Sequence, residues 1–148
     1  MNQEFAYGGI VFNKEGKVLM RSPMGHWGGY FWTFAKGGSD KSDKTPEETA
    51  IREVKEETGY ECNILSIIPG EFESDTCTTK YFLMEPTGVK VEHDKETQEI
   101  KWVDEEEAFK MIEQTKTLKG RNRDKQALES AIKLRDLLKV NSGSENVI

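Results

Sequence analysis

The chain has 148 residues, of which 32% are charged and 35% hydrophobic, and its formal net charge is −6. This length most simply makes one domain, which we place at residues 1–140, followed by a flexible tail at 141–148. No apolar run reaches the roughly 18 residues that a membrane helix needs, and the N-terminal sequence MNQEFAYGG lacks the regions of a secretory signal. We therefore expect a cytoplasmic protein. Because the net charge is negative, we do not expect extensive nucleic-acid binding.

The N-terminal part of the chain predicts two strands and a long loop. Residues 5–13 and 17–22 have the composition of strands and are joined by a turn that contains Gly16. Residues 23–44 are rich first in glycine and aromatic residues and then in polar residues, so we expect loops around one short strand. Loops of this length inside a compact domain tend to carry function.

The clearest local signal is that of a helix over residues 45–58. Thr45 suits the N-cap, Pro46 the first helical position and Glu48 the capping box, while Gly59 follows the end. Strand-like segments follow at 60–68, 79–85 and 98–104, and then helices at 104–114 and 124–140. Because strands and helices do not alternate regularly, this order favours an α/β fold with a mixed β-sheet flanked by helices.

Within the first predicted helix, the sequence REVKEETG at 52–59 crowds acidic residues onto one face. Glu53, Glu56 and Glu57 are three or four positions apart, where like charges repel by a few tenths of a kcal/mol per pair. Two readings remain open: a solvated helix face, or a site for a hard divalent cation. Just before the helix, Lys36 and two glycines could approach a phosphate closely, although most such glycines only form turns.

These two features together resemble the Nudix box. That pattern is a glycine, five residues, a glutamate, seven residues, and then Arg-Glu-U-x-Glu-Glu-x-Gly-U, where U is apolar. Residues 38–60 match eight of its nine constrained positions, with Tyr60 as the last apolar residue and Lys44 in place of the first glutamate. Strand-like segments outside the box extend the resemblance to roughly residues 5–135.

The resemblance implies a Nudix-like α/β/α sandwich that hydrolyses a nucleoside diphosphate linked to another group, with Mg²⁺ or Mn²⁺ as cofactor. By analogy, Glu53, Glu56 and Glu57 bind the metal together with the backbone carbonyl of Gly38. Glu53 and Glu57 also count as catalytic residues, because Glu53 either binds the metal or helps to activate water. Arg52 is expected to orient Glu53.

Two positions around the box leave alternatives open. Lys44 cannot bind Mg²⁺ as an ammonium group, so it is either a tolerated loop variant or a contact to substrate phosphate. Relatives also use an acid ahead of a strand tryptophan. With Trp102 as that tryptophan, the spacing favours Glu96 over Glu99 as a catalytic and metal-binding residue, and exposed loop charge is the competing explanation.

The leaving group is not determined by the fold. Segments 78–85 and 98–104 look like members that act on dinucleoside polyphosphates such as diadenosine tetraphosphate, and a nucleoside triphosphate is equally acceptable. RNA 5′-pyrophosphohydrolases, diphosphoinositol-polyphosphate hydrolases and a noncatalytic nucleotide-binding regulatory module are alternatives. The small-molecule nucleotide is expected to stack on aromatic side chains and to contact lysines, for which the candidates are Trp27, Tyr30, Trp32, Lys36 and Lys44.

Overall fold

The computed structural model describes residues 5–74 and 77–146, with side chains described as far as Lys139. Its main sheet is mixed and has the strand order β3-β1-β6-β4, with β5 also paired to β6. The strands of this sheet are β1 (Phe5–Val11), β3 (Lys36–Gly37), β4 (Tyr60–Ile67), β5 (Phe72–Glu73) and β6 (Thr78–Lys90). Strand β1 runs parallel to β6, whereas the other pairs in this sheet are antiparallel.

A separate two-stranded ribbon pairs β2 (Val18–Pro23) with β7 (Thr97–Val103) in antiparallel register. A kinked 3₁₀ segment, η1 (Met24–Gly29), follows β2. Gln98 ties η1 to the start of β7, because its Oε1 accepts the Gly25 N–H at 3.0 Å. The ribbon therefore holds the loop after β2 close to the segment that precedes β7.

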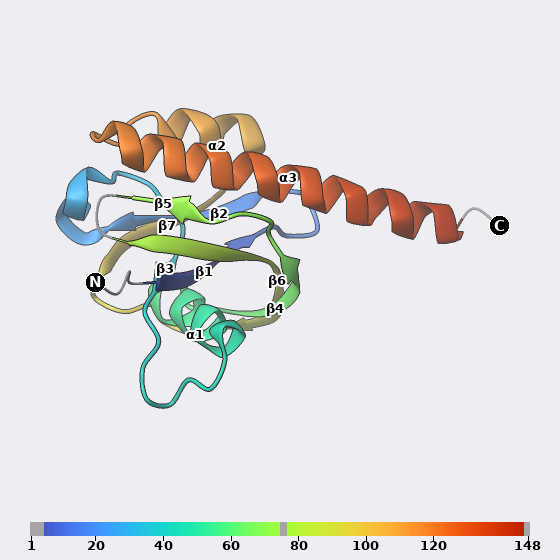
Figure 1. Ribbon diagram of the computed structural model, residues 1–148, viewed down its shortest axis with the longest axis horizontal. Coiled ribbons are helices and arrows are strands. Elements are labelled where there is room, and N and C mark those ends of the chain that lie inside the picture. Colours follow the sequence, from blue (N-terminus) through green and yellow to red (C-terminus); the bar gives the residue numbers. More distant parts are fainter. Residues whose placement is uncertain (1–4, 75–76, 147–148) are drawn as a thin grey trace.

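Helices cover both faces of the sheet, with α1 (Pro46–Thr58) on one side and α2 (Glu105–Ile112) and α3 (Leu118–Asn146) on the other (Figure 1). Two buried clusters fill the two interfaces. Ala50 and Val54 of α1 pack in the cluster that contains Phe82 and Met84 of β6. Leu128 and Ala131 of α3 belong to the other cluster. This arrangement confirms the predicted α/β fold with a mixed sheet and flanking helices.

The local signals of α1 act as the sequence predicts. The Thr45 hydroxyl accepts the Glu48 N–H at 3.1 Å, and the Glu48 carboxylate accepts the Lys44 N–H at 2.6 Å. Gly59 ends the helix with φ +83, and a Cβ atom there would collide with the carbonyl of Val91. Glycine is required at this position for both reasons, since the left-handed conformation is costly for other residues.

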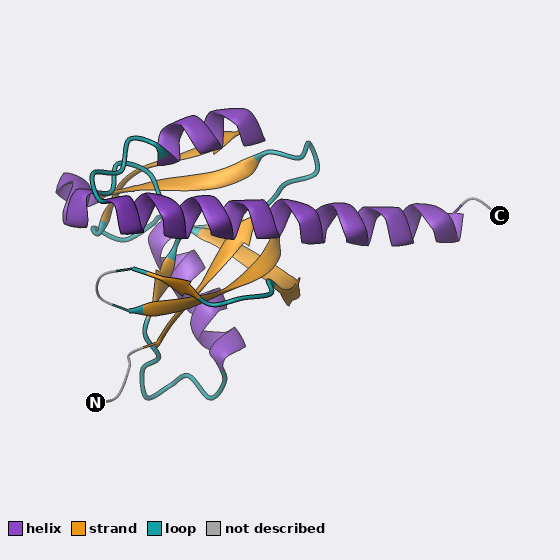
Figure 2. Cartoon of the chain, turned by 45° about the horizontal axis from the view of Figure 1, so that its top comes forward, coloured by secondary structure: helices purple, strands orange, loops and turns teal. Residues whose placement is uncertain are grey.

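The last helix begins earlier than the sequence predicts. Its first residue is Leu118 rather than Asp124, and the Thr117 hydroxyl accepts the Gly120 N–H at 3.1 Å as an N-cap side chain does. The apolar pattern on which the prediction rests starts only at Ala127, so the polar first turns were missed. The helical backbone continues to Asn146, beyond the predicted boundary at 140, and α3 extends past the sheet (Figure 2). The proposed division into domain and flexible tail stays a prediction.

Among the helices that the structure describes, we find none that combines the length and the apolar character required to cross a membrane.

Candidate functional site

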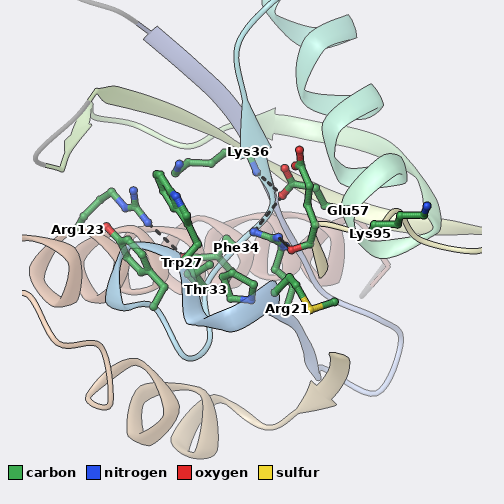
Figure 3. A pocket seen from close by; sticks show the side chains of 12 residues that line it. Arg21, Trp27, Thr33, Phe34, Lys36, Glu57, Lys95 and Arg123 are labelled. Carbon is green, nitrogen blue, oxygen red and sulfur yellow. Dashed lines mark hydrogen bonds and ion pairs between the residues drawn. The ribbon is translucent and has the colours of Figure 1, made fainter. Parts of the chain in front are cut away.

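A cavity of about 500 Å³ opens between α1, the ribbon and the first turns of α3. Acidic, basic and aromatic side chains all contribute to its walls (Figure 3). The lining residues are Arg21, Pro23, Met24, Trp27, Tyr30, Thr33, Phe34, Lys36, Glu57, Lys95, Glu96 and Arg123. A mixed lining of this kind is typical of small-molecule sites, where a few polar groups orient a ligand against apolar walls.

Glu57 brings the acidic face of α1 to one end of this cavity. The residue is only 5% exposed, its carboxylate lies 3.4 Å from the Arg21 guanidinium, and it accepts the backbone N–H of Lys36 at 3.3 Å. Burial raises the pKa of Glu57 to about 8, although the charge of Arg21 opposes this shift. A carboxyl group that is poorly solvated in its charged form gains the most from a cation placed beside it.

Glu53 lies one turn earlier, against the short strand β3. The position of Gly37 leaves room for it, because a Cβ atom on Gly37 would collide with the Glu53 carboxylate. Burial raises the pKa of Glu53 to about 7, and the charges of Glu56, Glu96 and Asp94 add to the increase while Arg52 opposes it. The predicted crowding of acids on this helix face is therefore present, and the loop before β7 adds two further acids to it.

Arg52 connects the acidic face to the loop before α1. Its guanidinium lies 2.7 Å from both Asp43 and Glu56 and 3.6 Å from Glu53, and it donates to the Gly38 carbonyl at 3.0 Å. The bond from Arg52 lowers the pKa of Asp43 to about 2. Asp43 was not predicted from the sequence, because it occupies one of the unconstrained positions of the box.

The two glutamates ahead of Trp102 lie in different environments. Glu96 precedes β7, lines the cavity and contributes to the raised pKa of Glu53, while its backbone carbonyl accepts from Met24 and Arg21. Glu99 lies within β7, opposite Ser22, and is not among the residues that line the cavity. This placement supports the choice of Glu96, whose role remains a prediction.

The aromatic candidates divide between the cavity and the core. Trp27, 69% exposed, and Tyr30 line the cavity, whereas Trp32 packs against the core beneath α3 and has Lys101 over its ring at 5.8 Å. Trp27 belongs to η1, in which the non-glycine His26 adopts φ 53. The structure therefore does not bring Trp32 to the cavity with the other candidates.

The lysine candidates divide in the same way. Lys36 lines the cavity between the acidic and aromatic ends, and burial lowers its pKa, as does the charge of Arg123. Lys44 is exposed at the entry of α1 and is not among the cavity-lining residues. A contact between Lys44 and a substrate phosphate would thus require a ligand that extends beyond the cavity.

Sequence reasoning missed the exposed Lys95 and three buried polar residues of the cavity, Arg21, Thr33 and Arg123. These three residues lie on a strand or helix or beside one, where polar side chains are normally solvated, and each is buried. A signal was present for Arg123, since it and Asp124 precede Ala127 and Leu128 on the inward face of α3. Buried charges in such positions are retained when they are paired.

The acidic residues fit a hard divalent cation in chemistry and in charge. Their oxygen atoms are the ligands that Mg²⁺ and Mn²⁺ prefer. Burial is the main cause of the raised pKa values of Glu53 and Glu57, and a bound cation would stabilise the charged form that burial disfavours. Arg21 and Arg52 supply part of that charge. Across residues 5–74 and 77–146, no three acidic, histidine or cysteine side chains already form a coordination cluster.

Comparison with known proteins gives a consistent result. The family model of the NUDIX domain matches residues 3–128. The 8-oxo-dGTP diphosphatase of Proteus vulgaris is 32% identical over 81 residues, which cover 51% of this chain and 70% of that protein. The RNA pyrophosphohydrolase of Marinomonas sp. (strain MWYL1) is 41% identical over 59 residues, 40% of this chain and 34% of that protein.

Among solved structures, the binary complex of a C. elegans Ap4A hydrolase superposes with a TM-score of 0.67 at 22% identity. The match covers 90% of this chain and 98% of that structure. At this level of identity the likeness shows the fold alone. The chain spans only about a third of the RNA pyrophosphohydrolase, so the substrate of that relative cannot be transferred directly.

Proposed function

Because this chain belongs to the Nudix family of pyrophosphohydrolases, we propose that it cleaves a pyrophosphate bond in a small nucleotide with the help of Mg²⁺ or Mn²⁺. The proposed substrate is a dinucleoside polyphosphate or a nucleoside triphosphate. The relatives named above act on 8-oxo-dGTP, RNA and Ap4A, and all three names describe nucleotide phosphates.

One observation carries the proposal: a single cavity joins Glu57, on the acidic face of α1, to buried cations and to an aromatic wall. Glu57 lies at the acidic end, Lys36 in the middle and Trp27 at the other end (Figure 3). Glu96 acts on the charge of Glu53 at the acidic end, and Tyr30 packs against Arg123 at the aromatic end. A nucleotide has the same order of groups, with a charged phosphate chain at one end and a flat base at the other.

Each side chain of the acidic end has a defined task in this proposal. Glu53, Glu56, Glu57 and Glu96, with the Gly38 carbonyl, would hold the cation, which when bound neutralises pyrophosphate charge and makes water more acidic. Arg52 holds Glu56 and the loop at Gly38 in place. Arg21 fixes the Glu57 carboxylate. This fixed arrangement reduces the reorganisation that the reaction requires.

Lys36 and the aromatic wall serve binding. Burial of the Lys36 ammonium strengthens its attraction to phosphate, since electrostatic interactions are stronger where water is excluded. Trp27 is exposed enough to stack on a base, which contributes roughly 1–3 kcal/mol in other nucleotide-binding proteins. The proposal therefore places the base at Trp27 and Tyr30 and the scissile bond near Glu57.

The test is a substrate panel with and without Mg²⁺. It contains dinucleoside polyphosphates, nucleoside triphosphates, diphosphoinositol polyphosphates and 5′-triphosphorylated RNA. We expect Mg²⁺-dependent release of nucleotide from the first two classes. Tight nucleotide binding without turnover of any substrate would contradict the proposal and indicate a noncatalytic binding module.

One feature favours RNA 5′ ends as a second candidate. Residues 116–139 contain eight basic and three acidic residues, and the Lys116 N–H bonds the Gly29 carbonyl of η1 at 2.9 Å. The start of this basic segment thus adjoins the loop that carries Trp27, where the continuation of a nucleotide chain could lie. Faster turnover of triphosphorylated RNA than of the free triphosphates, with a strong decrease at high salt, would favour this candidate.

A further inference from the structure

The aromatic end of the cavity has a fixed guanidinium group at its base. Arg123 lines the cavity although it is only 2% exposed. Its Nε donates to Asp124 at 2.9 Å, and one terminal nitrogen donates to the Thr33 hydroxyl at 3.2 Å. The Tyr30 ring lies against the guanidinium, with its centre 4.8 Å from the Arg123 Cζ. These contacts hold the guanidinium in one orientation.

The hydrogen bonds at this point leave an excess of donors. Both Asp124 carboxylate oxygens are used, one by Arg123 and the other by the Thr33 hydroxyl at 2.7 Å. An arginine carries five N–H groups, and the bonds just described use only two of them. In the described part of the chain, the buried Tyr81 hydroxyl next to this group also has no hydrogen-bond partner. A ligand that reaches this point therefore meets N–H donors and few acceptors.

The position of Arg123 matches the expected position of a base. Figure 3 places Arg123 and Trp27 on the opposite side of the cavity from Glu57, with Lys36 between them. The charge of Lys36 interacts with Arg123 as well as with Glu57, which agrees with this intermediate position. A nucleotide with its phosphates near Lys36 and Glu57 would direct the edge of its base toward Arg123.

We propose that Arg123 selects the base by donating a hydrogen bond to the O6 oxygen of a 6-oxopurine, that is, guanine or hypoxanthine. Adenine carries an amino donor at the same position, so its N–H groups would face the remaining N–H groups of Arg123, and these would lack an acceptor. A purine is favoured over a pyrimidine because its larger ring covers more of Trp27 and Tyr30. This inference rests on the proposed nucleotide function and adds to it a preference for the base, which the sequence leaves open.

The first experiment compares ligands on the unmodified protein. Guanosine, inosine and adenosine triphosphate analogues, with methylene groups in place of both bridging oxygens, are titrated in the presence of Mg²⁺. Inosine and adenosine differ only at the 6 position and in the N1 proton. We expect the guanosine and inosine analogues to bind at least about tenfold more tightly than the adenosine analogue. Equal binding, or a preference for adenosine, would overturn the inference.

The second experiment assigns the preference to Arg123. In Arg123→Lys the positive charge remains but the planar array of N–H donors is lost. The affinity of the guanosine and inosine analogues should then exceed that of the adenosine analogue by no more than roughly threefold. Arg135→Lys is the matched control, because Arg135 also lies on α3, pairs with the following aspartate and packs on an aromatic ring, that of Phe12. A ratio that persists in a folded Arg123→Lys protein would refute the assignment. If that variant does not fold, the ligand series decides.

The two proposals fail in different ways. Equal turnover of guanosine and adenosine substrates would leave hydrolysis in place and remove the base assignment. Absence of turnover with a retained preference for 6-oxopurines would do the opposite.

Discussion

Glu96 and Glu99 lie three residues apart and differ in what their carboxylates can reach. Glu96 precedes β7 and its backbone is fixed by bonds from Met24 and Arg21, so its side chain stays at the cavity near Glu53. Glu99 lies within the paired strand β7, where the two-residue alternation of side chains fixes the direction of its carboxylate. The carboxylate of Glu96 can therefore act in the cavity, whereas that of Glu99 cannot reach it.

We predict that Glu96→Gln lowers the turnover number at least about tenfold, which corresponds to roughly 1.4 kcal/mol of transition-state stabilisation. The amide keeps the size of the side chain and removes its charge from the acidic end of the cavity. Glu99→Gln is the matched control and should change turnover much less. The two variants should be compared at saturating Mg²⁺, after circular dichroism has shown that both are folded. A larger loss of turnover in Glu99→Gln than in Glu96→Gln would show that Glu99, and not Glu96, has this role.

Lys44 tests the one departure from the box. Its side chain is exposed and lies outside the cavity lining, so Lys44→Glu should change turnover only a few-fold, less than the tenfold step that about 1.4 kcal/mol produces. The measurement is kcat and KM for substrates of increasing phosphate chain length. A KM that increases most for the longest chains would show instead that Lys44 contacts phosphate.

At the scale of elements, α1 shows which signals in a sequence are sufficient to predict where a helix begins and ends. Its N-cap, first proline and final glycine involve residues close in sequence, and all three occur as predicted. The spacing of its glutamates also predicts a shared face, and the charge of Glu56 acts on Glu53 as the charge of Glu53 acts on Glu57. The start of α3 was missed, because Leu118 to Arg123 carry no apolar period. Local sequence rules thus predict the position of a helix better than they predict which other elements it packs against.

The acidic face of α1 makes stability depend on pH and on metal. The pKa values of Glu53, about 7, and of Glu57, about 8, lie above the ordinary value of 4.5. Between about pH 5 and about pH 8 the folded chain therefore holds protons that the unfolded chain has lost, so the metal-free protein should lose stability as pH rises through this range.

Mg²⁺ should reverse this trend, because it binds the deprotonated carboxylates. The increase in the melting temperature caused by Mg²⁺ should be small near pH 5 and largest above about pH 8. Thermal unfolding monitored by circular dichroism across this range gives the answer. Chelator-treated protein without divalent cations serves as the reference. A Mg²⁺ effect that is equal at all pH values would show that these carboxyl groups do not hold the cation.

At the scale of the whole molecule, the cavity depends on contacts between distant parts of the chain. The sequence predicts Lys36, Glu57, Trp27 and Tyr30, which lie in or near one recognisable segment. It does not predict that Arg21 of β2 and Arg123 of α3 meet them, because the pairing of β2 with β7 and the packing of α3 involve residues far apart in sequence. Trp32 illustrates the same limit, since only the packing of the core shows that it faces away from the cavity.

The central claim is that the acidic end of the cavity is a metal-dependent hydrolytic site, and Glu57→Gln tests it most directly. The exposed Glu47, in the first turn of the same helix, provides the matched control Glu47→Gln. We expect Glu57→Gln to lose turnover by about a hundredfold or more, as the loss of several kcal/mol implies, while its metal-free stability is unchanged or higher. Glu47→Gln should keep its activity. Undiminished Mg²⁺-dependent turnover in a folded Glu57→Gln protein would contradict the account.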